Sequence, residues 1–272
     1  MSASTQITAF ERVLRARHPN RPYSLDLFTS IFTDFVEVHG DRRYADDAAI
    51  VCGFARLDGE EIAVVGQQKG RDINQRRHRN FAMTKPEGYR KALRVMKVAE
   101  KFRRPIITFI DTPGAYPGID AEERGQAEAI AFNLREMAAI RVPIITVILG
   151  EGGSGGALAI GIADRILMME NAVYSVISPE GCASILWKDA GQAARAADCL
   201  RLTAGDLFEF GVIDEIIPEP ADWAIDAEED YEKINRGLKE AIIRHLLEVR
   251  SIDPEQLVDQ RYQKFRNMGS WM

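Results

Sequence analysis

A strand, a glycine-rich loop and the start of a helix follow one another without a break near the middle of the chain, and this stretch constrains the fold most. Residues 142–149 form an apolar run typical of a buried strand, and Glu151-Gly152-Gly153-Ser154-Gly155-Gly156 leads from it into small and apolar residues at 157–160. Glycine accepts positive φ angles and leaves backbone N–H groups uncovered. Since N–H groups at a helix start attract negative charge, we predict that this loop holds a phosphate, a carboxylate or an oxyanion formed in a reaction.

Apolar runs and helical periodicities alternate along most of the chain. Two runs at 49–57 and 61–67 flank Asp58-Gly59, which predicts a β-hairpin. Strands that alternate with helices need crossover connections, so the predicted fold class is α/β with a mainly parallel sheet. Further strands are expected at 105–111, 142–149, 165–169, 173–177 and 212–217, and helices at 7–43 with a break at 19–22, then at 86–102, 121–139, 231–250 and 254–266.

The 272 residues are expected to form a single domain, because no internal repeat or low-complexity linker divides them. We expect an N-terminal helical segment over 1–45, a central core over 46–220 and C-terminal helices over 221–272. The acidic stretch at 222–232 is expected to be a surface loop before the terminal helices.

Composition excludes several classes of protein. With 46% hydrophobic and 28% charged residues the chain is typical of a globular protein, and no apolar run approaches the roughly 20 residues that cross a bilayer. Residues 1–6 lack the features of a secretory signal, and Cys52, Cys182 and Cys199 are too far apart for a CxxC metal motif. We therefore expect a cytoplasmic protein with reduced thiols and no zinc of its own. The net charge of −6 argues against a dedicated nucleic-acid site.

Positive charge is concentrated in one segment. Residues 69–104 contain thirteen Lys or Arg against three acidic residues. Such a segment attracts an anionic ligand, for example a nucleotide-bearing thioester, or it is a solvated helix face, and the sequence leaves both interpretations open.

The glycine loop fits three familiar patterns poorly. Gly150, Gly152 and Gly155 satisfy G-x-G-x-x-G, with Glu170 at the spacing of a dinucleotide site, but the helix that follows is short for such a unit. Ser154 satisfies the G-x-S-x-G of hydrolases, but only His245 follows it, in a helical context. A flexible linker lacks a buried strand and an apolar helix on its two sides, and a Walker loop needs Gly-Lys-Ser/Thr.

An oxyanion hole fits the loop better. Two peptide N–H groups at a helix start hold a developing negative charge without any titrating side chain, as enolate chemistry on thioesters requires. Two more loops rich in glycine and proline, at 111–118 and 177–184, also follow predicted strands. Ligands bind at the carboxyl ends of strands in open α/β sheets, so we expect the three loops to form one composite site.

These loops lie within blocks that carry a resemblance to a known family. The chain resembles the carboxyltransferase α subunits of bacterial acetyl-CoA carboxylase, members of the crotonase-like superfamily, from about Ala16 to Trp271. A chance match over so many separate blocks is implausible. The blocks are Ala16-Arg17-His18-Pro19-Asn20-Arg21-Pro22-Tyr23, Gly66-Gln67-Gln68-Lys69-Gly70-Arg71, Phe109-Ile110-Asp111-Thr112-Pro113-Gly114-Ala115-Tyr116-Pro117-Gly118, Glu151 to Gly156, the stretch from Tyr174 to Lys188, and Ile216-Ile217-Pro218-Glu219-Pro220.

The resemblance implies a crotonase-like ββα spiral core with additional N- and C-terminal helices. It implies partners: a β subunit of similar fold in an α₂β₂ assembly, which also carries the zinc, a biotin carboxyl carrier protein, and biotin carboxylase in the larger ATP-dependent complex. The implied reaction moves a carboxyl group from carboxybiotin on the carrier to acetyl-CoA and gives malonyl-CoA for fatty acid biosynthesis. The chain is expected to be inactive without the β subunit.

The resemblance also implies site residues. The backbone N–H groups of Gly155 and Gly156 are expected to form an oxyanion hole for the ureido oxygen of biotin, which gains negative charge as the carboxyl group leaves. Lys69 and Arg71 are expected either to offset the charge of carboxybiotin or CoA or to form interface salt bridges, and Tyr116 either to line the biotin pocket or to pack within its loop. Residues 183–187 favour subunit packing. Further candidates for substrate binding are Gly153, Ser154, Ala157, Gly114 and Ala115.

Two alternative functions stay open at this point. One is an NAD(P)-binding oxidoreductase that uses Gly150, Gly152 and Gly155. The other is a carboxyltransferase that acts on a different acyl-CoA, because the acyl pocket is expected largely on the partner.

Overall fold

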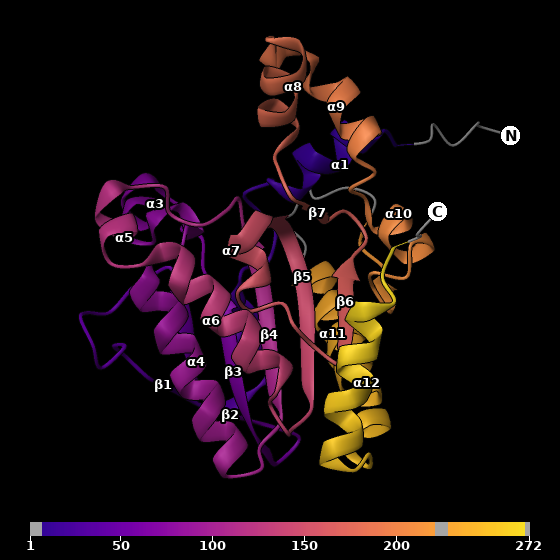
Figure 1. The fold of residues 1–272 in the computed structure, drawn as a ribbon. Coiled ribbons are helices and arrows are strands. Elements are labelled where there is room, and N and C mark those ends of the chain that lie inside the picture. The colour runs from indigo at the N-terminus through magenta and orange to yellow at the C-terminus, as the bar shows by residue number, and fades with distance from the viewer. Residues whose placement is uncertain (1–6, 221–227, 270–272) are drawn as a thin grey trace, which may run out of the picture.

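The computed structural model describes residues 7–220 and 228–269 and has an eight-stranded sheet at its centre (Figure 1). The strand order is β1-β2-β3-β4-β5-β6-β8, and β7 pairs with the end of β5. The first three strands are antiparallel and the remaining pairs are parallel, so the predicted α/β class with a mainly parallel sheet is confirmed. The strands are β1 (Thr33–Glu37), β2 (Ile50–Leu57), β3 (Glu60–Gln67), β4 (Ile106–Thr112), β5 (Ile144–Gly153), β6 (Arg165–Met169), β7 (Val173–Ser175) and β8 (Glu215–Ile217).

The predicted hairpin joins β2 to β3. Its two turn residues, Asp58 and Gly59, have φ angles of 49° and 85°, which match the right-handed twist of the flanking strands. Leu57 pairs with Glu60, and the register runs without a shift to Ile50 and Gln67. This register brings Gln67 to the carboxyl end of β3, the end at which the parallel strands also finish.

Helices cover both faces of the sheet. In Figure 1, α4 and α6 lie in front of the sheet and α11 lies behind it, while α8 and α9 project beyond the strand ends beside α1. The α-helices are α1 (Ala9–Ala16), α2 (Ser24–Ile31), α3 (Ile73–His78), α4 (Pro86–Lys101), α5 (Ile119–Glu123), α6 (Gln126–Ala138), α7 (Ser154–Leu158), α8 (Pro179–Trp187), α9 (Ala193–Leu200), α10 (Ala204–Glu209), α11 (Glu228–Arg250) and α12 (Pro254–Arg266), and two short 3-10 turns are η1 (Asn80–Ala82) and η2 (Ala190–Gln192).

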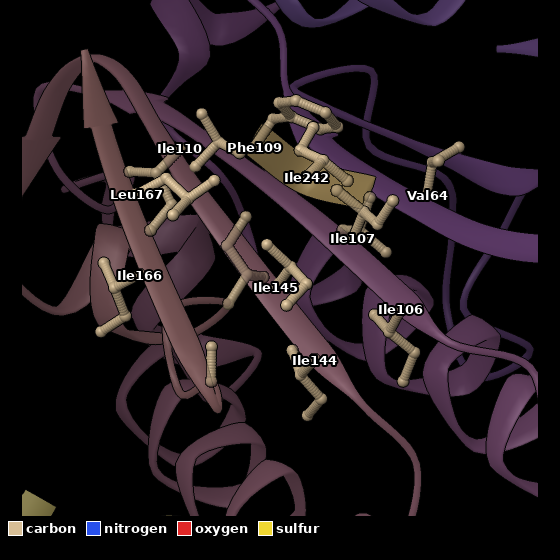
Figure 2. Packing of buried hydrophobic residues seen from close by; sticks show 14 of the residues in the cluster. Val64, Ile106, Ile107, Phe109, Ile110, Ile144, Ile145, Ile166, Leu167 and Ile242 are labelled. Atoms are coloured by element: carbon tan, nitrogen blue, oxygen red, sulfur yellow. The ribbon is translucent and has the colours of Figure 1, made fainter. Parts of the chain in front are cut away.

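The central strands are buried on both faces, as expected for a parallel sheet between helical layers. Every residue of β4 is buried. Figure 2 shows Ile242 of α11 over Ile107 and Phe109 of this strand, and Phe28 of α2 packs edge-on against Phe109 with ring centroids 5.6 Å apart. This core holds the carboxyl ends of β3, β4 and β5 in fixed relation to one another.

A buried ion pair anchors α12 to the sheet. Arg261, with 0% of its side chain exposed, makes two hydrogen bonds to the Asp164 carboxylate, at 2.9 and 2.8 Å. Its remaining N–H groups donate to the carbonyl oxygens of Met137, Ile140 and Val142. Every donor of the guanidinium therefore has a partner.

Several expected boundaries were wrong. Residues 33–37, expected in the N-terminal helical segment, form edge strand β1, and the helix expected at 121–139 is divided at Gly125, whose φ of 82° does not continue a helix. The last expected strand is shorter, at 215–217. In the acidic stretch at 222–232, residues 228–232 begin α11 and are not loop, and 222–227 lie outside the described residues.

Candidate functional site

Three loops come together at the carboxyl ends of β4, β5 and β7. Strand β5 runs through the glycine stretch to Gly153, and Gly152 pairs with Thr112 of β4 on one side and with Tyr174 of β7 on the other. Helix α7 begins at the next residue, Ser154. The expected meeting of the loops is confirmed, but residues 151–153 are extended strand and not the turn that the sequence suggested.

Glycine is required at positions 153 and 156 by the close approach of another backbone segment. A Cβ on Gly153 would overlap the carbonyl of Pro113, and one on Gly156 would lie 2.5 Å from the amide nitrogen of Ala115. None of the glycines from 150 to 156 has a positive φ, contrary to the sequence-based expectation; Ser154 alone does so in this loop, at 51°. A left-handed serine is a strained conformation that concentrates at functional sites.

The N–H groups of Gly155 and Gly156 lie in the first turn of α7, where a helix provides no internal acceptor. Gly153, at the N-cap position, has no side chain to accept them, and no other acceptor for them is found among the described residues. Gly155 is half-buried, whereas Gly156 is buried beneath the 113–115 loop. Two adjacent backbone donors at this position therefore have no acceptor among the described residues.

A mostly apolar cavity of about 320 Å³ opens beside Gly155. It is lined on the site side by Ser154 and Gly155, and elsewhere by residues of β7, α10 and α12 such as Tyr174, Leu207 and Phe265. A small ring system fits such a volume, and an apolar lining strengthens the hydrogen bonds that backbone donors make at its edge.

A cluster of paired charges lies behind the glycine loop. Lys69 Nζ lies 2.7 Å from Asp111 Oδ1 and 3.2 Å from Glu151 Oε2, and Arg17 bridges Glu151 to Glu180 at 2.7 Å each. Burial of Lys69 by itself lowers its pKa, but Asp111 and Glu151 outweigh this and raise the pKa above its usual range. Burial likewise favours the neutral acid of Glu151, yet Lys69 and Arg17 lower the pKa of this carboxyl. Both groups are therefore charged at neutral pH.

The three weaker side-chain candidates differ in setting. Lys69 is engaged by two carboxylates of its own chain, which favours a role in holding the loop. Arg71 pairs with Asp26, donates to the carbonyl of Pro19 at 2.9 Å and lies over the ring of Tyr23. The half-buried Tyr116 ring lies under Lys85 Nζ, 4.6 Å from the centroid.

The loop after β4 is held from below. Thr112 Oγ1 donates to the carbonyl of Ala82 at 2.6 Å and accepts from Gly114 N at 3.1 Å, and Tyr116 N donates to the carbonyl of Thr84. Ala82 ends three consecutive residues with positive φ, an uncommon left-handed turn. These contacts place Gly114 and Ala115 directly against Gly156, while Ala157 is buried behind it.

Sequence analysis missed Gln67 as a residue of this site. Its side-chain amide donates to the carbonyl of Gly156 at 2.7 Å and accepts from Asp111 N at 3.2 Å. The available signal was a glutamine directly after the apolar run at 61–66, within a block already singled out. A polar side chain at the end of a buried strand requires partners, because an unpaired buried amide is costly.

The other interpretations of the loop lack support in the geometry. Helix α7 has five residues, and Glu170 lies 3.8 Å from Arg12 instead of facing a nucleotide pocket. His245 lies on α11, where its Nε2 is 2.6 Å from Glu215 Oε2, so it is engaged away from Ser154. In the basic segment, many cations are paired within the chain, including Arg90 with Asp41 and Lys91 with Asp46.

Within the part of the chain that the structure describes, no cluster of three or more His, Cys, Asp or Glu could hold a metal ion, and none of the helices has the length and apolar composition of a membrane span. Cys52, Cys182 and Cys199 are free thiols, and burial raises the pKa of Cys52 to about 12.

Comparison with known proteins agrees with this geometry. Residues 2–269 match the family described as acetyl co-enzyme A carboxylase carboxyltransferase-like. The carboxyl transferase subunit α of acetyl-coenzyme A carboxylase from Geobacter metallireducens is 62% identical over 97% of this chain and 82% of its own length, and that from a strain of Thermus thermophilus is 54% identical over 97% and 84%. A Pseudomonas malonate decarboxylase hetero-tetramer crystallised with coenzyme A has a chain with the same fold, at a TM-score of 0.64 and 17% identity over 80% of this chain and 86% of that one. The predicted crotonase-like fold is confirmed.

Proposed function

The chain belongs to the acetyl-CoA carboxylase carboxyltransferase α-subunit family, and we propose that its catalytic contribution is the pair of backbone N–H groups at Gly155 and Gly156. It is a subunit of a biotin-dependent transferase that gives malonyl-CoA from acetyl-CoA. The interpretation as an NAD(P)-binding oxidoreductase is not supported. The single observation that carries the site assignment is that two adjacent N–H groups, without an acceptor among the described residues, lie in the first turn of α7, whose Ser154 and Gly155 line an apolar cavity.

The chemistry needs a site for transient negative charge. When the carboxyl group leaves the ureido nitrogen of carboxybiotin, the electron pair of the broken C–N bond remains on the ureido group and the oxygen becomes more negative. Gly155 and Gly156 donate hydrogen bonds to that oxygen. The methyl carbon of acetyl-CoA gives up a proton to the ureido nitrogen. The resulting enolate then forms the new C–C bond to the carbon of the released carboxyl group. Fixed backbone donors stabilise this charge without changing their own protonation.

The surrounding residues have supporting roles in this proposal. Gly153 and Gly156 permit the close approach of the two loops, Gly114 provides a positive φ of 156° in the second loop, and Ser154 and Ala157 complete the first turn of α7. Ala115 and Tyr116 border the substrate from the second loop. Lys69 and Arg71 offset negative charge nearby, Lys69 through the carboxylates that it neutralises.

The proposal includes the partners. This chain pairs with a zinc-bearing β subunit in an α₂β₂ assembly in the cytoplasm, receives carboxybiotin on a carrier protein charged by biotin carboxylase, and is inactive alone. The cavity supports this arrangement, since it is open at the surface, where a second chain has room to cover it. The absence of a metal cluster in residues 7–220 and 228–269 is compatible with zinc on the partner.

Gly155 offers a direct test, because a Cβ there has room. The nearest atom to such a Cβ is a methyl group of Ile130 at 3.5 Å, an ordinary contact. Gly155→Ala therefore keeps both the shape and the N–H. Gly155→Pro has the same Cβ but removes the N–H, which lies in the first turn of α7 and so has no acceptor within the helix.

The assay reconstitutes each variant with the β subunit and follows carboxyl transfer from malonyl-CoA to free biotin. We expect Gly155→Pro to lower kcat about 10²- to 10³-fold and Gly155→Ala to stay within about threefold of the wild type. Equal kcat for the two variants would contradict the oxyanion hole. A wild-type complex with no transfer would contradict the proposed function as a whole.

A further inference from the structure

Gln67 joins the end of one strand to the carbonyl of a proposed catalytic glycine. It is the last residue of β3 and has 0% of its surface exposed. Its Nε2 donates to the carbonyl oxygen of Gly156 at 2.7 Å, and its Oε1 accepts from the backbone N–H of Asp111 at 3.2 Å. Ser24 Oγ holds the Gln67 backbone carbonyl at 2.7 Å. The side-chain amide therefore bridges β4 and α7 from a fixed origin.

The Gln67 side chain connects β3 to β4 beyond the point where the backbone pairing of these two strands ends. The pairing of β3 with β4 ends at Gly66 and Phe109, two residues before Asp111. The Gln67 side chain takes the place of a backbone acceptor for Asp111 N, and Asp111 Oδ1 in turn accepts from Glu151 N at 2.9 Å. One glutamine thus ties together the ends of all three central strands at the site.

Helix α7 depends on such outside contacts. It has five residues, so its own backbone hydrogen bonds are few, and the direction of its first N–H groups is set by what the rest of the turn contacts. The 113–115 loop packs against the Cα of Gly156, and Gln67 holds the carbonyl of the same residue. These two contacts leave the first turn little freedom to rotate.

We propose that Gln67 is a positioning residue that orients the N–H groups of Gly155 and Gly156 for the transition state. This inference rests on the proposed function. A small rotation of the first turn would move both donors relative to the oxygen that they hold, and misplacement by about 1 Å costs about 10²-fold in rate. Substrate binding, which the partner and the cavity share, depends less on that angle.

Gln68 supplies a matched control in the next position. It is also a buried glutamine, but its amide accepts from Leu25 N at 2.9 Å and donates to the carbonyl of Lys69 at 2.7 Å, away from α7. Gln67→Met and Gln68→Met remove the same amide and keep a side chain of similar length. Gln67→Asn keeps an amide but shortens it by one methylene, so it cannot span β4 and α7.

The experiment measures kcat and KM for biotin in complexes of each variant with the β subunit, together with the melting temperature of each complex. We expect Gln67→Met and Gln67→Asn to lower kcat about 10- to 100-fold with KM within about twofold, and Gln68→Met to keep its kcat within about twofold even where it lowers the melting temperature as much. The loss of kcat would then depend on the hydrogen bond between Gln67 and Gly156 and not on the stability of the complex.

Three outcomes overturn the inference. If the Gln67 variants keep the kcat of Gln68→Met while the wild type is active, the proposed function stands and the positioning role fails. If both Gln67 variants fail to assemble with the β subunit, Gln67 serves the fold and not the orientation of the donors. If the wild-type complex itself transfers no carboxyl group, the proposed function fails first and this inference fails with it.

Discussion

Two buried clusters of charge in this protein are built in different ways. Arg261 under α12 uses every N–H group, two of them on one carboxylate and the rest on three carbonyls. Lys69 behind the glycine loop shares two carboxylates, and one of these is also held by Arg17. The Arg261 cluster contains one cation and one carboxylate, whereas the Lys69 cluster continues through Arg17 to Glu180 in another segment.

The difference follows from the two side chains. A guanidinium is planar and presents five donors in a fixed fork, so it can join one helix rigidly to one strand end. A lysine ammonium is a compact charge that accepts several geometries, so it can hold the ends of β4 and β5 together without dictating their angle. Precise orientation at the site is left to backbone contacts at Gly153 and Gly156 and to the amide of Gln67.

The largest loss of stability is expected when Arg261 is replaced. In Arg261→Met the buried Asp164 carboxylate keeps, among the described residues, only the hydrogen bond that Ile144 N donates to its Oδ2 at 2.7 Å. Three carbonyl oxygens also lose their donor. We expect the free energy of unfolding to fall by about 3–5 kcal/mol. Urea denaturation measures it, with the exposed Arg266→Met on the same helix as control. A loss equal to that of the control would show that the cluster adds no more than a surface charge.

The next effect concerns backbone contact at the site. Gly156→Ala places a Cβ 2.5 Å from Ala115 N and Gly114 C, and these backbone atoms cannot move aside cheaply. We expect a loss of stability of about 1–3 kcal/mol and a fall in kcat of about 100-fold. Gly155→Ala should instead stabilise by about 0.5 kcal/mol, because alanine restricts the unfolded chain. The two alanine variants are compared by denaturation and by carboxyl transfer, and changes of the same sign in stability would contradict the packing described.

Replacing Lys69 should cost less stability than replacing Arg261, and the loss should depend on pH. Lys69→Met removes one cation from Asp111 and Glu151, and we expect the free energy of unfolding to fall by about 2 kcal/mol at pH 7, because Arg17 and backbone N–H groups remain. Since the pKa of Glu151 is lowered in the folded chain, its stabilising contribution is present above about 4.5 and is lost as the pH falls through the folded value.

The difference in stability between wild type and Lys69→Met should therefore shrink as the pH falls from 7 to below 4.5. Denaturation at pH 7 and pH 4 measures this, with the exposed Lys101→Met as control. A difference that grows in acid would mean that Glu151 is not held in its charged form by Lys69.

The smallest effect is expected two residues further along the same motif. Arg71 is 43% exposed, and its pair with Asp26 is accessible to salt. Arg71→Met should lower the free energy of unfolding by about 0.5 kcal/mol, and 0.5 M NaCl should remove most of that difference. Thermal denaturation at low and high salt measures it. A salt-independent loss as large as that of Lys69→Met would remove the contrast between a buried and an exposed cation in this motif.

Local pattern was sufficient for most of the fold. Alternation of apolar runs with helical periodicity placed β2 to β6, and the Asp58-Gly59 turn set the hairpin register, because these signals act over a few residues. Strand β1 at residues 33–37 was not predicted, since an edge strand with one partner has a weak pattern and its assignment depends on residues of β2 that lie 16 to 23 positions away. The sequence also predicted the glycine loop and the second loop. It predicted that they meet, because the carboxyl ends of parallel strands lie at the same edge of a sheet.

What the sequence alone determined is the inventory: a parallel sheet, glycine-rich loops at its carboxyl edge, and residue blocks that resemble one family. Only the tertiary structure decided why the glycines are there, since the close approach of Gly153 and Gly156 to the 113–115 loop joins segments about 40 residues apart. It also decided that Lys69 is neutralised within the chain and that Gln67 holds Gly156. Contacts between distant segments depend on how the chain packs in three dimensions, and no local pattern of residue types records which partners a buried polar group finds.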